Sequence, residues 1–218
     1  MINIAIDGPA GSGKSTAARM LANKLGYVYI DTGAMYRVLT LKAIENNIDI
    51  FDKKAMTNLA NNTIIELYPG EPQEVYMDKK RVTEEIRRPD VSQQVSVAAG
   101  YKEVREKLVA GQQEIALQDN VVMDGRDIGT KVLPNATYKF FIDADIEQRA
   151  ERRYKELEAK GYTVTKEEIK ETLRLRDDQD TSRQYSPLAK ADDAILIDTT
   201  SLSAQEVVDK MYSIITGG

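Results

Sequence analysis

The 218-residue sequence contains no cysteine and no histidine. The lack of cysteine excludes a disulfide scaffold and thiolate metal sites. The lack of histidine removes the commonest general base and the commonest metal ligand of proteins. Any catalysis by this chain therefore has to work without a histidine-based triad and without a histidine-ligated zinc ion.

The sequence also lacks the segments that direct a chain into or across a membrane. No apolar run approaches the roughly 18 to 20 residues of a transmembrane helix. Residues Met1 to Ile4 enter a strand pattern at once, with no basic start and no cleavage site. The net charge is −5, which does not suggest a broad nucleic-acid-binding face. We therefore expect a soluble, cytoplasmic protein without nucleic-acid or membrane partners, and nothing in the sequence demands more than a monomer.

Strand and helix patterns alternate from the first residues onward. Ile2 to Asp7 is β-branched and alternating, as in a buried strand, and Gly8 to Gly13 is a glycine-rich turn. Apolar residues at helical spacing predict a helix over Lys14 to Leu25. A short strand, Tyr27 to Ile30, and a helix over about Ala34 to Glu45 follow. This order predicts an α/β fold with a mostly parallel sheet.

A different pattern occupies the region between about residues 58 and 99. Three short strands are separated by turn residues, with no helices between them. We interpret this region as an inserted antiparallel subdomain in a core of residues 1–57 and 100–218. The predicted strands are Thr63–Tyr68, Glu74–Met77 and Arg81–Ile86.

The α/β pattern then resumes and completes a predicted three-layer fold, a parallel sheet flanked by helices. The sequence predicts helices over Glu103–Leu117, about Ile146–Lys160, Lys166–Leu175 and Ala204–Ile215, strands over Val121–Met123, Tyr138–Ile142 and Ala194–Ile197, and a polar loop over Arg176–Lys190.

The glycine-rich turn fits the phosphate-binding loop, or P-loop, G-x-x-x-x-G-K-[ST]. Its glycines permit backbone angles that side chains would block, so that the loop amides can cradle phosphate oxygens. In this pattern the lysine reaches the β- and γ-phosphates and the serine hydroxyl binds Mg²⁺. The predicted ATP-binding residues are Gly8, Pro9, Ala10, Gly11, Ser12, Gly13, Lys14, Ser15 and Thr16, with Ser15 as the metal ligand through the ATP phosphates.

A P-loop alone does not identify the reaction. Switch GTPases share it and read guanine with Asn-Lys-x-Asp. The Asn-Lys pair of this chain, Asn23-Lys24, is not followed by the required aspartate and lies in the first predicted helix. A GTP switch is therefore a weak hypothesis.

Several arginines are suited to transfer between two phosphates, which needs cations to hold both partners and no general base. Arg126 lies just after a predicted strand, at the sheet edge where ligands bind in such folds, and Arg37 follows the segment Asp31-Thr32-Gly33-Ala34-Met35-Tyr36. Arg176 and Arg183 flank an acidic segment. Any one of these arginines taken alone is equally consistent with a solvated surface charge.

Three more arginines, Arg149, Arg152 and Arg153, lie three or four positions apart on a charged helix. They could belong to a lid that closes over ATP phosphates. Glutamates are interleaved with them, however, and the spacing by itself slightly favours a solvated face.

Three segments together resemble the bacterial cytidylate kinases, from the P-loop almost to the C-terminus. They are Asp31-Thr32-Gly33-Ala34-Met35-Tyr36-Arg37, Asp124-Gly125-Arg126-Asp127-Ile128-Gly129-Thr130 and Arg176-Asp177-Asp178-Gln179-Asp180. The resemblance implies transfer of the γ-phosphoryl group of ATP to CMP or dCMP with Mg²⁺. It also implies that the insert binds the monophosphate and that residues of about 146–176 form a short helical lid.

The resemblance implies a role for each matching residue. Arg37 and Arg126 would bind the CMP phosphate, and Ser96, Arg105 and Asp127 would read cytosine. Arg176 and Asp180 would contact the sugar, with Tyr36 and Arg183 nearby. The predicted CMP-binding residues also include Thr32 and Asp124. Lys14, Arg37, Arg126, Arg149 and Arg153 would be catalytic, and Arg152 would join the lid.

Two other functions remain open at this point. One is a P-loop kinase for another small acceptor, such as UMP, AMP or a metabolite. Asp127 argues for cytosine over uracil, because a carboxylate accepts a hydrogen bond from an amino group. The other is a non-enzymatic nucleotide-binding module, which would not need so many arginines.

Overall fold

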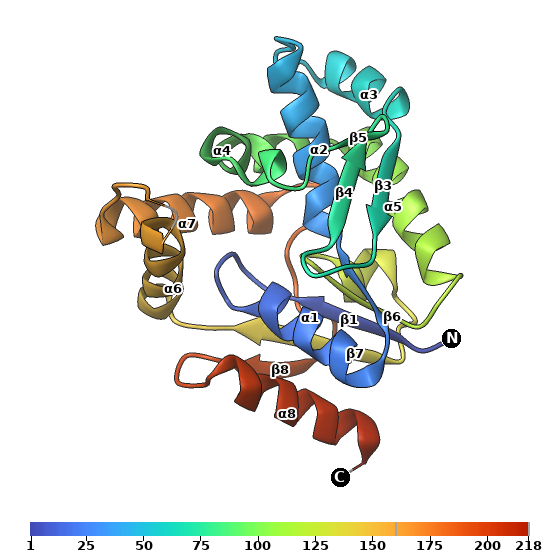
Figure 1. Ribbon diagram of the computed structural model, residues 1–218, viewed down its shortest axis with the longest axis vertical. Helices are drawn as coiled ribbons and strands as arrows, with labels where there is room; N and C mark the ends of the chain where they lie inside the picture. Colours follow the sequence, from blue (N-terminus) through green and yellow to red (C-terminus); the bar gives the residue numbers. More distant parts are fainter. Residues whose placement is uncertain (160, 218) are drawn as a thin grey trace.

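The computed structural model describes residues 1–159 and 161–217 (Figure 1). In chain order its elements are β1 (Asn3–Asp7), α1 (Lys14–Leu25), β2 (Val28–Asp31), α2 (Thr32–Glu45), α3 (Lys53–Asn61), β3 (Ile65–Tyr68), β4 (Glu74–Met77), β5 (Lys80–Arg81), a 3₁₀ turn η1 (Glu85–Arg87), α4 (Pro89–Ala98), α5 (Lys102–Ala116), β6 (Val121–Gly125), a π-helical turn η2 (Ile128–Val132), β7 (Tyr138–Asp143), α6 (Ile146–Ala159), α7 (Lys166–Ser182), β8 (Ile195–Asp198) and α8 (Ala204–Thr216).

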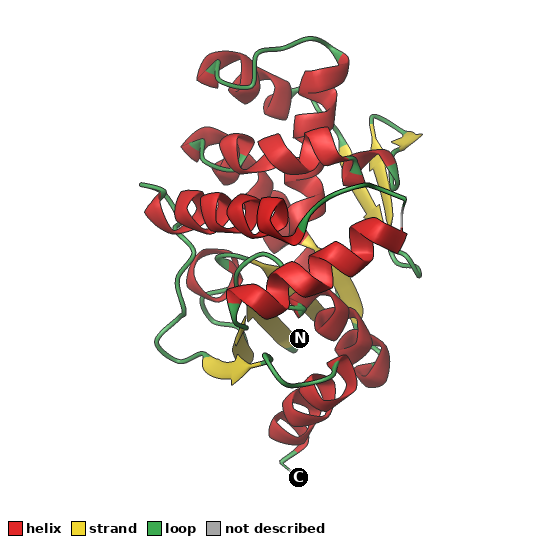
Figure 2. Ribbon diagram, turned by 90° about the vertical axis from the view of Figure 1, so that its left-hand side faces the viewer, coloured by secondary structure: helices red, strands yellow, loops and turns green. Residues whose placement is uncertain are grey.

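A five-stranded parallel sheet in the order β2-β6-β1-β7-β8 forms the centre of the molecule. Side chains alternate along its strands, so Ile4 and Ile6 pack with α1 and α8 on one face. Ala5 lies on the opposite face with residues of α5 and η2. Both faces are therefore buried, as in parallel sheets generally, and the predicted three-layer fold is confirmed (Figures 1 and 2).

The predicted antiparallel strands form a separate three-stranded sheet, β3-β4-β5. The prediction of a third strand over Arg81–Ile86 was wrong, because β5 ends at Arg81. The Thr83 hydroxyl accepts a hydrogen bond from the backbone N–H of Val75 at 3.0 Å, where a paired strand would offer a carbonyl. The chain then turns through η1, and Ile86 is fully buried against α2.

Two helices, α3 and α4, were missed by the sequence patterns. The Asp52 carboxylate caps the start of α3 by accepting a hydrogen bond from the Ala55 N–H at 3.0 Å. Pro89 opens α4, a position where proline costs no helical hydrogen bond. α4 packs on α2, so the region of residues 58–99 contains helices as well as the small sheet. The division of the chain at these residues stays a prediction.

The two helices predicted as a lid are α6 and α7, which pack against each other through a small apolar cluster of Ala150, Ile169 and Leu173. The prediction of a loop from Arg176 was wrong, because α7 continues to Ser182. Its second half is polar because one side faces solvent and the other faces charged groups of the core. Lys160, the predicted end of α6, and Gly218 lie outside the described residues.

Among residues 1–159 and 161–217, the helices are all too short or too polar to cross a membrane.

Candidate active site

The P-loop connects β1 to α1 at the carboxyl edge of the sheet. Gly8 has a φ of 151°, and a Cβ added there would lie 2.0 Å from the carbonyl oxygen of Ile142. Gly13, the cap residue of α1, has a φ of 90°. Both positions therefore require glycine, and the strand–turn–helix context predicted for the motif is present.

Residues far away in the sequence hold the P-loop in place. The Thr199 hydroxyl donates a hydrogen bond to the Ser12 carbonyl at 2.9 Å, and Arg152 Nη1 donates to the same carbonyl at 3.1 Å. Arg149 Nη1 donates to the Ala10 carbonyl at 3.0 Å and to the Asp177 carboxylate at 2.5 Å. Because α6 and α7 carry these arginines and this aspartate, the predicted lid is bonded directly to the P-loop.

Lys14 lies within this loop, and its Nζ donates a hydrogen bond to the Pro9 carbonyl at 3.1 Å. Burial, together with the positive charge of Arg126, lowers the pKa of Lys14 to about 7. Asp124 and Asp31 oppose this lowering without cancelling it, so the ammonium form would be stabilised further by an anionic ligand.

Ser15 points to the end of a neighbouring strand. Its hydroxyl donates a hydrogen bond to the Asp124 carboxylate at 2.6 Å, and the Tyr29 hydroxyl donates to the same carboxylate at 2.8 Å. Burial and the nearby charge of Asp31 raise the pKa of Asp124. The structure therefore pairs a hydroxyl and a carboxylate, the oxygen donors that Mg²⁺ prefers.

These donors fit a metal ion that is shared with a nucleotide. Within the described part of the chain, no cluster of three or more acidic side chains could hold an ion by itself. Mg²⁺ in kinases is bound through one or two protein oxygens plus substrate phosphates, and Ser15 and Asp124 offer that set.

A hollow beside the P-loop, here called the acceptor hollow, is lined by residues of α2, α4, α5, α7 and the loop after β6, and its charged side chains come from α5, from α7 and its end, and from that loop. Its lining residues are Thr32, Gly33, Tyr36, Val95, Ser96, Ala99, Arg105, Gly125, Arg126, Asp127, Arg176, Asp180 and Arg183.

A buried ion pair forms the floor of the acceptor hollow. Arg105 Nη2 donates to the Asp127 carboxylate at 2.5 Å, and the two side chains are 2% and 5% exposed. Arg105 Nη1 donates to the Ala99 carbonyl at 3.0 Å, and the guanidinium lies 5.1 Å from the centre of the Tyr36 ring. Three contacts therefore hold the guanidinium in one orientation.

Several buried polar atoms around the acceptor hollow have no hydrogen-bond partner among the described residues. They are Nε of Arg105, Nε of Arg176, and Nε and Nη2 of Arg183. Buried donors are normally paired, because an unpaired one costs about 1–3 kcal/mol. The hollow is therefore complementary to a ligand that is rich in hydrogen-bond acceptors.

α7 supplies the opposite wall of the acceptor hollow. Arg176 and Asp180 are one helical turn apart and project from the same face. Arg126 Nε donates to the Asp180 carboxylate at 2.8 Å, and Arg183 lies 3.7 Å from the same carboxylate. The polar part of α7, which the sequence predicted as a loop, is thus bonded to the loop after β6 through the Arg126–Asp180 pair.

The arginines near the P-loop repel one another. Burial and then the charge of Arg87 lower the pKa of Arg37 to about 10. Burial and then Arg126 lower the pKa of Arg176 to about 9. Arg153 also contributes to both shifts, although it pairs with Glu156 at 2.6 Å. Guanidinium groups do not lose their protons in proteins, so this excess positive charge favours binding of anions.

The structure brings most of the predicted CMP-binding residues together in the acceptor hollow. Arg37 and Asp124 are the two that do not line it. Arg37 donates to the Ser92 hydroxyl at 2.9 Å beside the hollow, and Asp124 faces the P-loop serine. The roles assigned to all of these residues stay proposals.

Several residues that shape the site were not predicted, among them Asp7, Asp31, Gln73, Arg87 and Thr199. Asp7 and Asp31 end buried strands, and that position could have marked them. Gln73, Arg87 and Thr199 reach the site only through tertiary contacts, so no pattern in the sequence marks them.

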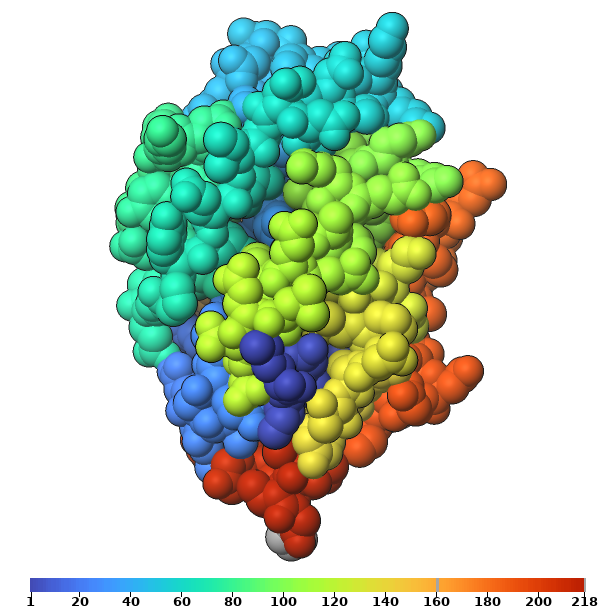
Figure 3. Space-filling view, turned by 90° about the vertical axis from the view of Figure 1, so that its right-hand side faces the viewer, coloured from blue at the N-terminus to red at the C-terminus, as the bar shows by residue number. Residues whose placement is uncertain are grey.

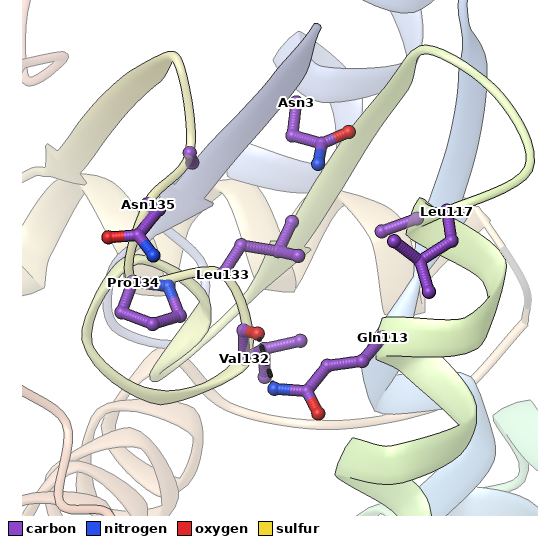
Figure 4. Close-up of a pocket in the computed structure, with 9 residues that line it drawn as sticks. Asn3, Gln113, Leu117, Val132, Leu133, Pro134 and Asn135 are labelled. Atoms are coloured by element: carbon purple, nitrogen blue, oxygen red, sulfur yellow. Dashed lines mark hydrogen bonds between the residues drawn. The ribbon is translucent and has the colours of Figure 1, made fainter. Parts of the chain in front are cut away.

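A second hollow of about 260 Å³ lies at the opposite end of the sheet, between the end of α5 and the loop after η2 (Figure 4). The N-terminal residues lie between these segments (Figure 3). Gln113 bonds the Val132 carbonyl across its floor at 2.9 Å. None of the described residues that line this hollow is charged, in contrast to the acceptor hollow.

Comparisons with known proteins agree on one family. A family model described as cytidylate kinase matches residues 4–217. The cytidylate kinase of Pediococcus pentosaceus is 52% identical, with 97% of this chain and 94% of that protein covered. The cytidylate kinase of Bacillus pumilus is 53% identical, with 96% and 94% covered.

Solved structures share the fold at much lower identity. An uncharacterised protein from Eubacterium ventriosum has a TM-score of 0.56 at 14% identity, with 100% of this chain and 99% of that chain covered. A shikimate kinase from Bacteroides thetaiotaomicron has a TM-score of 0.50 at 11% identity, with 99% and 98% covered. At these identities the likeness concerns the fold alone.

Proposed function

Because the chain belongs to the cytidylate kinase family, we propose that it transfers the γ-phosphoryl group of ATP to CMP or dCMP, giving ADP and CDP or dCDP. It is thus an ATP-dependent nucleoside monophosphate kinase. The observation that carries the choice of acceptor is the buried Arg105–Asp127 pair, surrounded by unpaired donors, in the acceptor hollow.

The base of CMP would lie against this pair. Cytosine presents an amino group, which donates hydrogen bonds, next to a ring nitrogen and a carbonyl oxygen, which accept them. Asp127 would accept from the amino group, while Arg105 and the Ser96 hydroxyl would donate to the acceptors. Uracil has a carbonyl where cytosine has the amino group, so it would place an acceptor against the Asp127 carboxylate.

The sugar and phosphate of CMP would lie along α7 and the loop after β6. Asp180 and Arg176 line the acceptor hollow, together with Tyr36, Thr32 and Arg183. The CMP phosphate would be bound by Arg37 and Arg126. Their positive charges would offset its charge and aim one of its oxygens at the γ-phosphorus of ATP.

ATP would lie in the P-loop, whose amides and Lys14 hold its phosphates. Mg²⁺, when bound with ATP, neutralises charge on the β- and γ-phosphates, and Ser15 and Asp124 are the residues that would hold it. Arg149, Arg152 and Arg153 on the lid would exclude water and stabilise the charge on the transferred group. The attacking oxygen already belongs to a phosphate anion, so no general base is required.

The test is an ADP-release assay with ATP and Mg²⁺ in which CMP, dCMP, UMP, AMP and GMP are offered in parallel. We expect turnover with CMP and dCMP well above that with the other three nucleotides. Absence of CDP from the CMP reaction would refute the proposed function. Turnover with another of the five would move the proposal to that acceptor.

All residues proposed for both substrates come from one chain. We propose that the chain acts as a monomer.

A further inference from the structure

The carboxylate of Asp7 is a buried charged group with no direct part in the proposed reaction. Asp7 ends β1, immediately before the first glycine of the P-loop, and is 3% exposed. One of its oxygens accepts a hydrogen bond from the backbone N–H of Ile128 and the other from that of Gly129, both at 2.7 Å. The two bonds fix the position of this backbone segment relative to β1.

The segment held by Asp7 directly follows the residues that face the acceptor hollow. β6 pairs with β1 up to the register Asp7 opposite Gly125, and Arg126 and Asp127 come next. Ile128 and Gly129 open the π-helical turn η2, where the Asp127 carbonyl accepts hydrogen bonds from two later backbone N–H groups. Asp127 therefore lies between a fixed strand end and a fixed turn.

We propose that Asp7 is a positioning residue for the phosphoryl acceptor: its carboxylate sets the orientation of the Arg126–Asp127 segment and so the affinity and base preference for the nucleoside monophosphate. This inference rests on the proposed function. β1 would then act in two ways: the P-loop follows it in the chain, and its Asp7 side chain fixes the loop after β6.

The contacts of Asp7 require a carboxylate. Two N–H donors converge on the two oxygens, and an amide would have to turn its own NH₂ group toward one of them. Burial is the main reason that the pKa of Asp7 is raised to about 7; Asp127 adds to the rise, while the two N–H groups and Arg126 oppose it and favour the charged form.

The loop also has little space in which to shift. A Cβ added to Gly129 would lie 3.2 Å from Cδ of Lys139 and 3.4 Å from Asp7 Oδ2. Lys139 is itself tied to the Pro134 carbonyl and to Asp193. If one Asp7 hydrogen bond is lost, the crowded loop cannot restore it by a local shift. We therefore expect the orientation of Asp127 to change.

The test is Asp7→Asn, assayed with CMP varied at saturating ATP and then with ATP varied at saturating CMP. We expect the KM for CMP to rise about tenfold, the loss of one hydrogen bond to a charged acceptor. The KM for ATP should stay within about twofold, and the preference for CMP over UMP should fall. Val208→Ala, in the core between the sheet and α8, is the control for lost stability and should leave the KM for CMP unchanged.

Equal increases in the two KM values, or no increase in either, would overturn the proposal. If Asp7→Asn does not accumulate as folded protein, Asp7→Ser, whose hydroxyl can accept one of the two bonds, is measured in the same way. Hydrogen exchange without substrates separates this inference from the function: the Ile128 and Gly129 amides should exchange faster in the variant than in the parent chain. Unchanged exchange would overturn the inference, whereas a parent chain inactive with CMP would overturn only the function.

Discussion

At the scale of single residues, the acceptor hollow is defined by charges that the fold buries. Arg105 and Asp127 are almost completely enclosed, and removal of one partner of such a pair leaves an uncompensated charge. The arginines around them keep unpaired donors. These buried charged residues, whose removal from water costs free energy, are thus the ones to which the proposed reaction assigns roles.

The first residue-scale prediction concerns base recognition by Asp127. In Asp127→Asn we expect kcat/KM for CMP to fall about 10- to 100-fold, because a charge-assisted hydrogen bond to the amino group of cytosine is lost. The preference for CMP over UMP should fall with it, while the KM for ATP stays close to that of the parent chain. Steady-state kinetics with both nucleotides measure this.

Asp119→Asn is the matched control, because Asp119 is exposed on the turn after α5. It should behave like the parent chain. A loss in Asp127→Asn that is equal for CMP and UMP would contradict the role of this carboxylate in base selection.

The second residue-scale prediction concerns the protonation of Lys14. Its pKa without nucleotide is about 7, so most of the side chain is neutral at pH 8. ATP phosphates stabilise the ammonium form and raise that pKa. Binding of ATP at pH 8 should therefore take up close to one proton, measured by calorimetry in buffers of different ionisation enthalpy.

In Lys14→Met this proton uptake should disappear. Binding to the parent chain without proton uptake at pH 8 would show that Lys14 is already charged in the free protein.

At the scale of elements, β2 is an edge strand of the parallel sheet, and Gln73, which immediately precedes β4 of the small sheet, bonds to the backbone of β2. Gln73 accepts a hydrogen bond from the Asp31 N–H at 3.1 Å and donates one to the Tyr29 carbonyl at 2.6 Å. The Gln73 amide thus pairs a backbone N–H and a backbone carbonyl of the edge strand, as a neighbouring strand would. Arg87, from the turn η1, pairs with the Asp31 carboxylate at 2.7 Å and adds a second attachment.

The element-scale prediction is that Gln73→Ala lowers the free energy of unfolding by about 1–3 kcal/mol, the cost of leaving buried backbone groups unpaired. Urea denaturation measures it. Gln93→Ala on the exposed side of α4 is the matched control and should change stability by less than about 0.5 kcal/mol. Equal effects of the two substitutions would mean that water replaces the amide at the edge.

At the scale of the whole molecule, three separate parts of the chain meet at the acceptor hollow. The loop after β6 follows a strand of the parallel sheet, α2 and α4 pack against each other, and α7 is part of the predicted lid. Figure 1 shows these parts arranged around the P-loop. A ligand in the hollow therefore contacts all three and should stabilise them together.

The whole-molecule prediction is a rise in the thermal midpoint on binding of CMP. At a concentration of about 100 times Kd, binding adds about 2.7 kcal/mol to the free energy of unfolding. For a chain of this length that corresponds to roughly 5–10 °C, measured by calorimetry. GMP at the same concentration is the control and should give a much smaller rise; equal rises would contradict a hollow selective for cytosine.

The sequence by itself determined the P-loop, the parallel α/β core and the family, because these depend on local order along the chain. Gly8, Gly13 and Lys14 act within one turn, and alternating strands and helices permit few arrangements. Arg126 was found for a related reason, since it follows β6 and the carboxyl ends of parallel strands lie at one edge.

Only the tertiary structure decided which of these groups meet. The polar half of α7 resembled a loop because its buried side faces charges, not an apolar core, and helical periodicity measures apolar faces only. The length of β5 depended on a side chain, Thr83, that replaces a ladder partner. Asp7, Gln73 and Thr199 act through contacts between segments far apart in the chain, and no local pattern encodes such contacts.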